Sequence, residues 1–161
     1  MNRGAIHSLD AYVQGKMLDS SSWNGRLPRR ITPSDIDHVF DNSGRMIFVE
    51  FSRDLRKQVW ADCERGQRMV YEELVTQGNG NHIATLCFHD VPVTQQVDTR
   101  TDIRTFHVMY FNCHLRDVRY SDLLSGDLWE WLVLRWFESP ETILNAMTED
   151  YQNKLFDEVK K

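Results

Sequence analysis

Three carboxylates in the first half of this 161-residue sequence have the types and spacing of metal ligands. Asp35 and Asp37 are two residues apart in a predicted strand, so their side chains share a face. Glu50 lies near the end of the next predicted strand, and a tight hairpin would bring Asp37 and Glu50 opposite each other. Facing carboxylates repel unless a cation lies between them, and Mg²⁺ or Mn²⁺ takes carboxylate oxygens. The pattern therefore indicates a metal site that could support hydrolysis.

A polar residue, Gln67, interrupts the apolar stripe of the helix expected after Glu50. Tyr71 follows four residues later, on the same helix face. A buried amide needs a hydrogen-bond partner, which favours a polar neighbour for Gln67. The simpler alternatives are that Gln67 lies at the margin of the stripe with its amide in water, and that Glu50 points to solvent from a strand end.

These segments together resemble the core of the PD-(D/E)XK nucleases. The matching segments are Pro33–Asp37, Phe48–Ser52 and Gly66–Tyr71, and the Gln-x-x-x-Tyr element in the last is similar to the RecB-like branch. The resemblance covers residues 5–88, roughly half of the chain, and leaves residues 90–161 as an extension of unknown role. It implies one nuclease-like domain over residues 1–161, with a restriction-endonuclease-like αβββαβ core.

The resemblance also implies roles for individual residues. Asp37 matches the first metal-binding acid of the family, with Asp35 as the alternative, and Glu50 matches the second. Gln67 and Tyr71 match the pair that braces the site and the end of the DNA. The implied activity is Mg²⁺- or Mn²⁺-dependent hydrolysis of phosphodiester bonds in DNA.

One position departs from the family's pattern. The family has a lysine two residues after the second acid, which would position the attacking water and stabilise charge on the phosphate, but Ser52 stands there. A serine hydroxyl supplies no positive charge. Three explanations stay open. Lys57 or Lys16 supplies the cation, the metal acts alone in a slow enzyme, or the domain is a catalytically degenerate module that binds DNA or a protein partner.

Basic residues flank both acidic segments. The cluster before the first segment is Arg26, Arg29 and Arg30, and the cluster after the second is Arg53, Arg56 and Lys57. We expect the arginines to border the site and hold the phosphate backbone without reading its sequence. For any single arginine, solvated surface charge is the alternative.

The elements that must position these residues follow from hydrophobic periodicity. The sequence predicts helices over 5–18, 54–74 and 128–137, a last helix from 140 toward 159, and strands over 31–40, 46–51, 82–88 and 103–112. The order α, β, β, α, β, β, α, α is typical of an α+β (or α/β) domain with a small mixed sheet flanked by helices.

Composition limits the function classes. A net charge of −5 excludes a protein that coats nucleic acid by bulk charge. No apolar run has the length of a membrane span, and an odd number of cysteines, three, favours a reducing cytoplasm over a disulfide framework. The pairs Cys87–His89 and Cys113–His114 lack the usual spacing of zinc ligands. The tryptophan-rich segment 128–137 is either core or an interface with a partner or a second copy.

Overall fold

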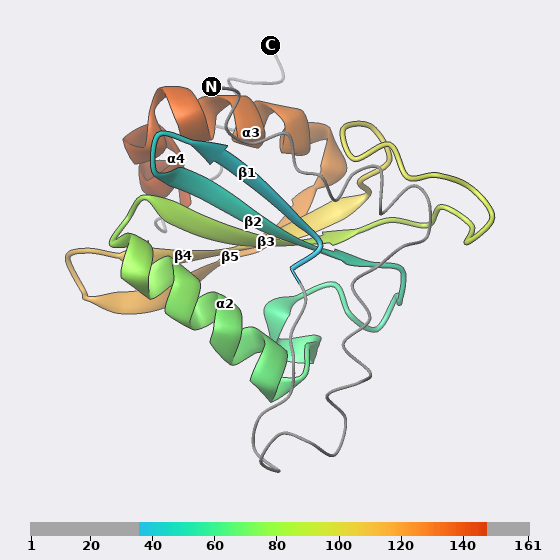
Figure 1. Ribbon diagram of the computed structural model, residues 1–161, viewed down its shortest axis with the longest axis horizontal. Coiled ribbons are helices and arrows are strands. Elements are labelled where there is room, and N and C mark those ends of the chain that lie inside the picture. The colour runs from blue at the N-terminus through green and yellow to red at the C-terminus, as the bar shows by residue number, and fades with distance from the viewer. Residues whose placement is uncertain (1–35, 148–161) are drawn as a thin grey trace, which may run out of the picture. The chain divides into compact units, whose positions relative to one another are not determined.

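A computed structural model of the chain describes residues 36–147, and Figure 1 shows how their helices and strands are arranged. The strands are β1 (His38–Asn42), β2 (Arg45–Ser52), β3 (His82–Phe88), β4 (Thr105–Asn112) and β5 (Asp117–Ser125). The helices are α2 (Arg65–Gly78), α3 (Trp129–Glu138) and α4 (Pro140–Met147), with short 3-10 segments η2 (Trp60–Asp62) and η3 (Gly126–Leu128). The strands form one open mixed sheet in the order β1-β2-β3-β4-β5, with α2 on one face and α3 and α4 on the other. This architecture confirms the expected α+β fold.

The first two strands form the antiparallel hairpin that the sequence predicts. Only Ser43 and Gly44 connect them, with φ of 55° and 86°. Positive φ at both central positions gives a two-residue turn that matches the twist of the strands. In the observed register His38 pairs with Val49, so the preceding residue, Asp37, comes level with Glu50.

A helical crossover joins β2 to β3, which run parallel. Ile47 and Val49 of β2 belong to the core beneath α3, whereas Phe48 belongs to the core beneath α2. Side chains alternate along a strand, so Glu50 lies on the α2 face together with Phe48. α2 ends at Gly78 and is capped by Asn79, which has a left-handed φ of 47°.

The helix expected over 54–74 begins later than predicted. Val59 and Cys63 have extended backbones on either side of η2, so the chain does not form a continuous helix before Arg65. A long-range contact explains the difference. The backbone N–H of Trp60 donates to Nδ1 of His107 at 2.9 Å, and its indole N–H donates to the His107 carbonyl oxygen at 3.1 Å. These bonds hold the segment against β4, and the apolar spacing reflects this packing, not helical periodicity.

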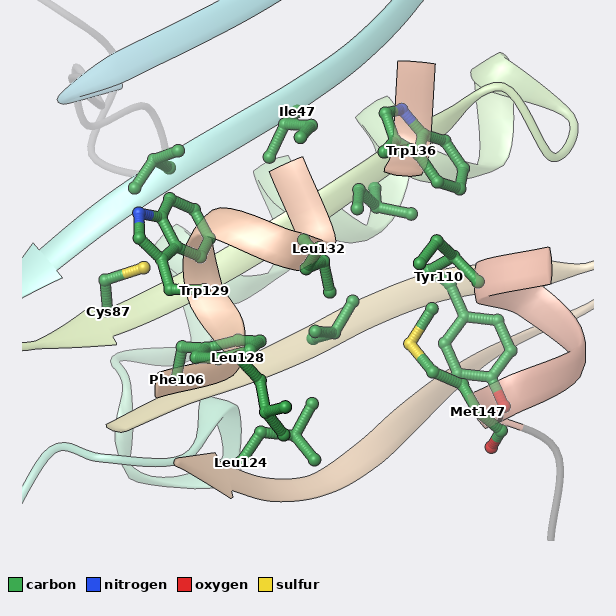
Figure 2. Close-up of a cluster of buried hydrophobic side chains, with 14 of the residues drawn as sticks. Ile47, Cys87, Phe106, Tyr110, Leu124, Leu128, Trp129, Leu132, Trp136 and Met147 are labelled. Atoms are coloured by element: carbon green, nitrogen blue, oxygen red, sulfur yellow. Dashed lines mark hydrogen bonds between the residues drawn. The ribbon is translucent and has the colours of Figure 1, made fainter. Parts of the chain in front are cut away.

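The second half of the described chain completes the same sheet and core. β4 pairs with β3, and β5, a strand that the sequence analysis did not predict, pairs with β4. Most β5 side chains are exposed, so its sequence lacks the apolar alternation of a strand with one buried face. Figure 2 shows the larger core, where side chains from β2, β3 and β4 meet those of α3 and α4.

The tryptophan-rich segment belongs mainly to this core. Trp129 and Trp136 are 1% and 0% exposed. Of the two alternatives that the sequence left open, core or interface, these two side chains belong to the core. α4 begins at Pro140, as the Ser-Pro-Glu pattern predicts, because proline suits the first position of a helix. Its predicted continuation toward 159 lies outside the described residues after Met147. Among residues 36–147, no helix combines the length and the apolar character that crossing a bilayer requires.

Candidate active site

The carboxylate of Glu50 is held on both oxygens by α2. Nε2 of Gln67 donates to Oε1 at 2.6 Å, and the hydroxyl of Tyr71 donates to Oε2 at 2.7 Å. Gln67 and Tyr71 are one helical turn apart, so a single face of α2 presents both donors. The structure therefore brings together three residues that the sequence singled out, and the amide of Gln67 bonds to a protein group instead of facing only water.

Packing fixes one of these donors firmly. Tyr71 is 1% exposed, and its ring contacts that of Trp60 with centroids 4.8 Å apart. Both rings lie in the smaller core beneath α2, which also includes Phe48 of β2. The orientation of the Glu50 carboxylate is thus set by a buried aromatic side chain and not by a mobile surface group.

Asp37 lies beside Glu50 in the hairpin. Its Oδ2 accepts a hydrogen bond from the backbone N–H of Phe51 at 2.8 Å, which anchors the carboxylate across the hairpin. Phe51 follows Glu50 directly, and the negative charge of Asp37 acts on Glu50. The predicted pairing of two carboxylates across the hairpin has a physical basis in this bond and in the strand register.

The electrostatics of Glu50 differ from those of a surface glutamate. Burial raises its pKa to about 7, and the charge of Asp37 acts in the same direction. The hydrogen bonds from Tyr71 and Gln67 and the charge of Lys57 lower this pKa but do not cancel the rise. Burial, with the adjacent Glu50, also raises the pKa of Tyr71, so the phenol remains a donor at neutral pH. Glu50 therefore exchanges a proton near neutral pH.

This raised pKa predicts a pH-dependent stability of the metal-free protein. A glutamate whose pKa is higher in the folded state contributes most stability below its unfolded pKa, and loses that contribution as pH rises toward 7. Urea unfolding in EDTA should show the free energy of unfolding falling by about 1–3 kcal/mol more between pH 4.5 and 8 in wild type than in Glu50→Gln. Glu130→Gln, on α3, is the matched control and should follow wild type. If the free energy of unfolding changed equally with pH in wild type and Glu50→Gln, the raised pKa of Glu50 would be contradicted.

Ser52, where the resemblance stated above would place a lysine, builds a turn. Its Oγ accepts a hydrogen bond from the N–H of Asp54 at 3.2 Å, and the N–H of Lys57 donates to the Asp54 carbonyl oxygen at 2.8 Å. The turn brings the charge of Lys57 close enough to lower the pKa of Glu50. Lys57 therefore lies in a turn before η2 and not on a helix, which corrects the sequence expectation. The Ser-x-Asp pattern after the strand is the sequence signal for this turn, which sequence reasoning missed.

The arginines that follow β2 are exposed, but they are not equivalent. Arg56 forms an ion pair with Asp54, in which its Nε and Nη2 donate to the Asp54 carboxylate at 3.0 and 2.9 Å. An exposed pair of this kind is weak, so a phosphate can compete for Arg56. Arg53 is exposed one residue after β2. The other predicted site residues, Asp35, Lys16, Arg26, Arg29 and Arg30, lie outside the described residues.

Two carboxylates are the candidate metal ligands at this site within the described range. No group of three histidine, cysteine, aspartate or glutamate side chains gathers at one point within residues 36–147. Cys87 is fully buried, with its thiol 3.7 Å from the hydroxyl of Thr85, and Nδ1 of His89 accepts a hydrogen bond from Val91 at 3.3 Å. Asp37 and Glu50 are thus the pair that would hold a hard divalent cation, with waters and phosphate oxygens completing its shell.

No family model, curated protein or solved structure matches this chain. The case for a function therefore depends on the site itself.

Proposed function

We propose that this protein is a metal-dependent nuclease that hydrolyses phosphodiester bonds of DNA at the Glu50 site. One observation carries the proposal. Gln67 and Tyr71 each bond one oxygen of the Glu50 carboxylate, while Asp37 adds a second negative charge beside it. Two partly buried carboxylates in one place oppose folding unless a cation joins them. Such an arrangement is typical of a site kept for chemistry and not for stability.

The donor set suits Mg²⁺ or Mn²⁺. Asp37 and Glu50 offer hard oxygen donors, and each Glu50 oxygen that accepts one hydrogen bond retains a lone pair. A cation between the two carboxylates would relieve the repulsion that contributes to the raised pKa of Glu50. When bound there, the ion would lower the pKa of a coordinated water and polarise the phosphate.

The residues of the chain then have separate tasks. Gln67 and Tyr71 keep the Glu50 carboxylate in one orientation. Lys57 provides positive charge near the position where the phosphate gains negative charge, in place of the family's lysine. Arg53, which is exposed directly after β2, would hold the phosphate backbone in this proposal. Glu50 must be ionised to bind the cation, so activity at subsaturating metal should rise as pH increases through about 7.

The alternative function is a catalytically degenerate module that binds DNA or a protein partner. The observation that favours it is Ser52, whose hydroxyl is engaged by the backbone of Asp54 and supplies no charge. In this alternative, Gln67 and Tyr71 stabilise an inherited carboxylate that no longer takes part in a reaction. The nuclease requires both DNA and a metal, whereas the degenerate module requires no metal and binds either DNA or a protein partner.

We also infer a cytoplasmic location and a DNA partner. Cys63, Cys87 and Cys113 are free thiols, as expected in a reducing compartment. A net charge of −5 means that local contacts near the site, and not bulk charge, must hold the DNA. A second copy or a protein partner on α3 would have to use its exposed side, which includes Leu134.

Metal binding tests the proposal directly. Calorimetric titration of the metal-free protein with Mn²⁺ at pH 8 should give one site, and Glu50→Gln should weaken it about tenfold or more because one ligand charge is lost. Glu130→Gln on α3 serves as the control and should bind like wild type. Absence of Mn²⁺ binding by wild type, with DNA binding retained, would reject the nuclease and favour the degenerate module.

A further inference from the structure

A second site lies on the other flank of α2. Gln67 and Tyr71 face Glu50, whereas the next residue after each, Arg68 and Glu72, lines an open pocket of about 580 Å³. The pocket lies between α2, the segment around η2, and the strands β4 and β5. The same two turns of helix therefore form one wall of the pocket and hold the proposed catalytic carboxylate.

Two parallel aromatic rings line this pocket. The rings of His107 and Tyr120 stack with centroids 5.8 Å apart and an interplanar angle of 18°. Nδ1 of His107 accepts the N–H of Trp60, and Nε2 lies 2.7 Å from the carbonyl oxygen of Ser121, so the imidazole is a neutral donor there. The Tyr120 hydroxyl donates to Glu72 at 2.6 Å. Both rings are therefore fixed, and neither offers a free group for catalysis.

The rest of the lining combines apolar walls with a polar rim. Val59, Ala61 and Leu123 supply apolar surface, and Leu123 is 45% exposed. At the rim, Nε of Arg68 lies 3.4 Å from a carboxylate oxygen of Glu72, so the charges of these two residues largely compensate each other. Asp122 adds a further negative charge. This balance disfavours a phosphate inside the pocket and suits a flat, uncharged group with hydrogen-bonding edges.

We propose that this pocket binds an unpaired nucleobase, so that the substrate of the Glu50 site is single-stranded or frayed DNA. A base has a face to stack beside Tyr120 and polar edges within reach of Arg68 and Asp122. Its own phosphates would remain outside the pocket, and neighbouring nucleotides of the strand would have to pass around α2, which is about 10 Å wide, to reach the Glu50 site. The inference rests on the proposed function for the source of the base, but binding of the base is measurable without cleavage.

The pocket is tested by a charge placed in its apolar wall. Compared with Leu134→Arg, which adds the same charge elsewhere, Leu123→Arg should bind a fluorescein-labelled single-stranded oligo-dT in EDTA about 5- to 100-fold more weakly, the scale of one stacked base, and should bind a blunt duplex equally well. Leu134→Arg, an exposed leucine on α3, is the matched control. Tyr120→Leu removes the stacking surface without adding charge and should also lose single-strand affinity. Single-strand affinity equal to wild type in both pocket variants would overturn the proposal.

A second measurement separates this inference from the proposed function. In ¹H–¹⁵N spectra, thymidine added to the metal-free protein should shift the amides of Tyr120, Ser121 and Arg68, and Leu123→Arg should abolish these shifts. Shifts at the pocket without any cleavage of DNA would reject the nuclease and keep the base site. Cleavage that does not distinguish single strands from blunt duplexes, with no thymidine shifts, would keep the nuclease and reject the base site.

Discussion

Glu50→Ala is expected to reduce Mg²⁺-dependent cleavage of DNA by about 10³-fold or more. The substitution removes one of the two carboxylates that would hold the ion, and it leaves the amide of Gln67 and the hydroxyl of Tyr71 without their acceptor. The measurement is the initial rate on linear and plasmid DNA at pH 8 in Mg²⁺ and in Mn²⁺. Addition of EDTA should reproduce the loss in wild type.

Two controls make this result specific to the site. Glu130→Ala removes a carboxylate on α3, where the side chain is 53% exposed and pairs with Arg100, and should cleave at the wild-type rate. Unfolding in urea should show that Glu50→Ala is folded, since loss of a half-buried charge does not empty the apolar core. Cleavage that survives Glu50→Ala would reject both the nuclease and its degenerate alternative, because the reaction would then occur elsewhere.

The sequence predicted the site best where its residues are joined by local geometry. A two-residue turn fixes the register of β1 and β2, so the approach of Asp37 to Glu50 follows from spacing alone. The spacing of Gln67 and Tyr71 similarly places both on one helix face. That face meets Glu50 because α2, in the crossover between the parallel strands β2 and β3, packs on the sheet beside β2.

Features that depend on distant contacts could not be predicted in this way. The conformation of the segment before α2 depends on the hydrogen bond from Trp60 to His107, which lies 47 residues later in the chain. This bond holds the segment in place of the first turns of the expected helix. β5 has mostly exposed side chains and depends on its pairing with β4. The turn that brings Lys57 near Glu50 is local, but its direction relative to the sheet follows from the packing of Trp60.

If the protein cleaves DNA as proposed, Lys57→Ala is expected to lower the rate of cleavage by about 10²-fold while Mn²⁺ and DNA binding at pH 8 change little. Lys57 is the lysine of residues 36–147, and its charge acts on Glu50. Removing that charge raises the pKa of Glu50 in the metal-free protein, so at subsaturating metal the acid side of the pH–rate profile should move to higher pH. Lys57→Arg, which keeps the charge, should retain most of the activity and the wild-type profile. An unchanged rate and profile in Lys57→Ala would reject its role.

Adding a lysine at position 52 completes this test. β2 places residues 50 and 52 on the same face, so Ser52→Lys would direct an ammonium group toward the Glu50 site, at the cost of the bond to Asp54. If charge is what Lys57 supplies, Ser52→Lys combined with Lys57→Ala should recover about tenfold or more of the lost rate. If wild type binds DNA but does not cut it, cleavage gained by Ser52→Lys alone would identify the protein as a degenerate nuclease. No recovery in the double variant, with Mn²⁺ binding intact, would mean that Lys57 acts through the position of its turn and not through its charge.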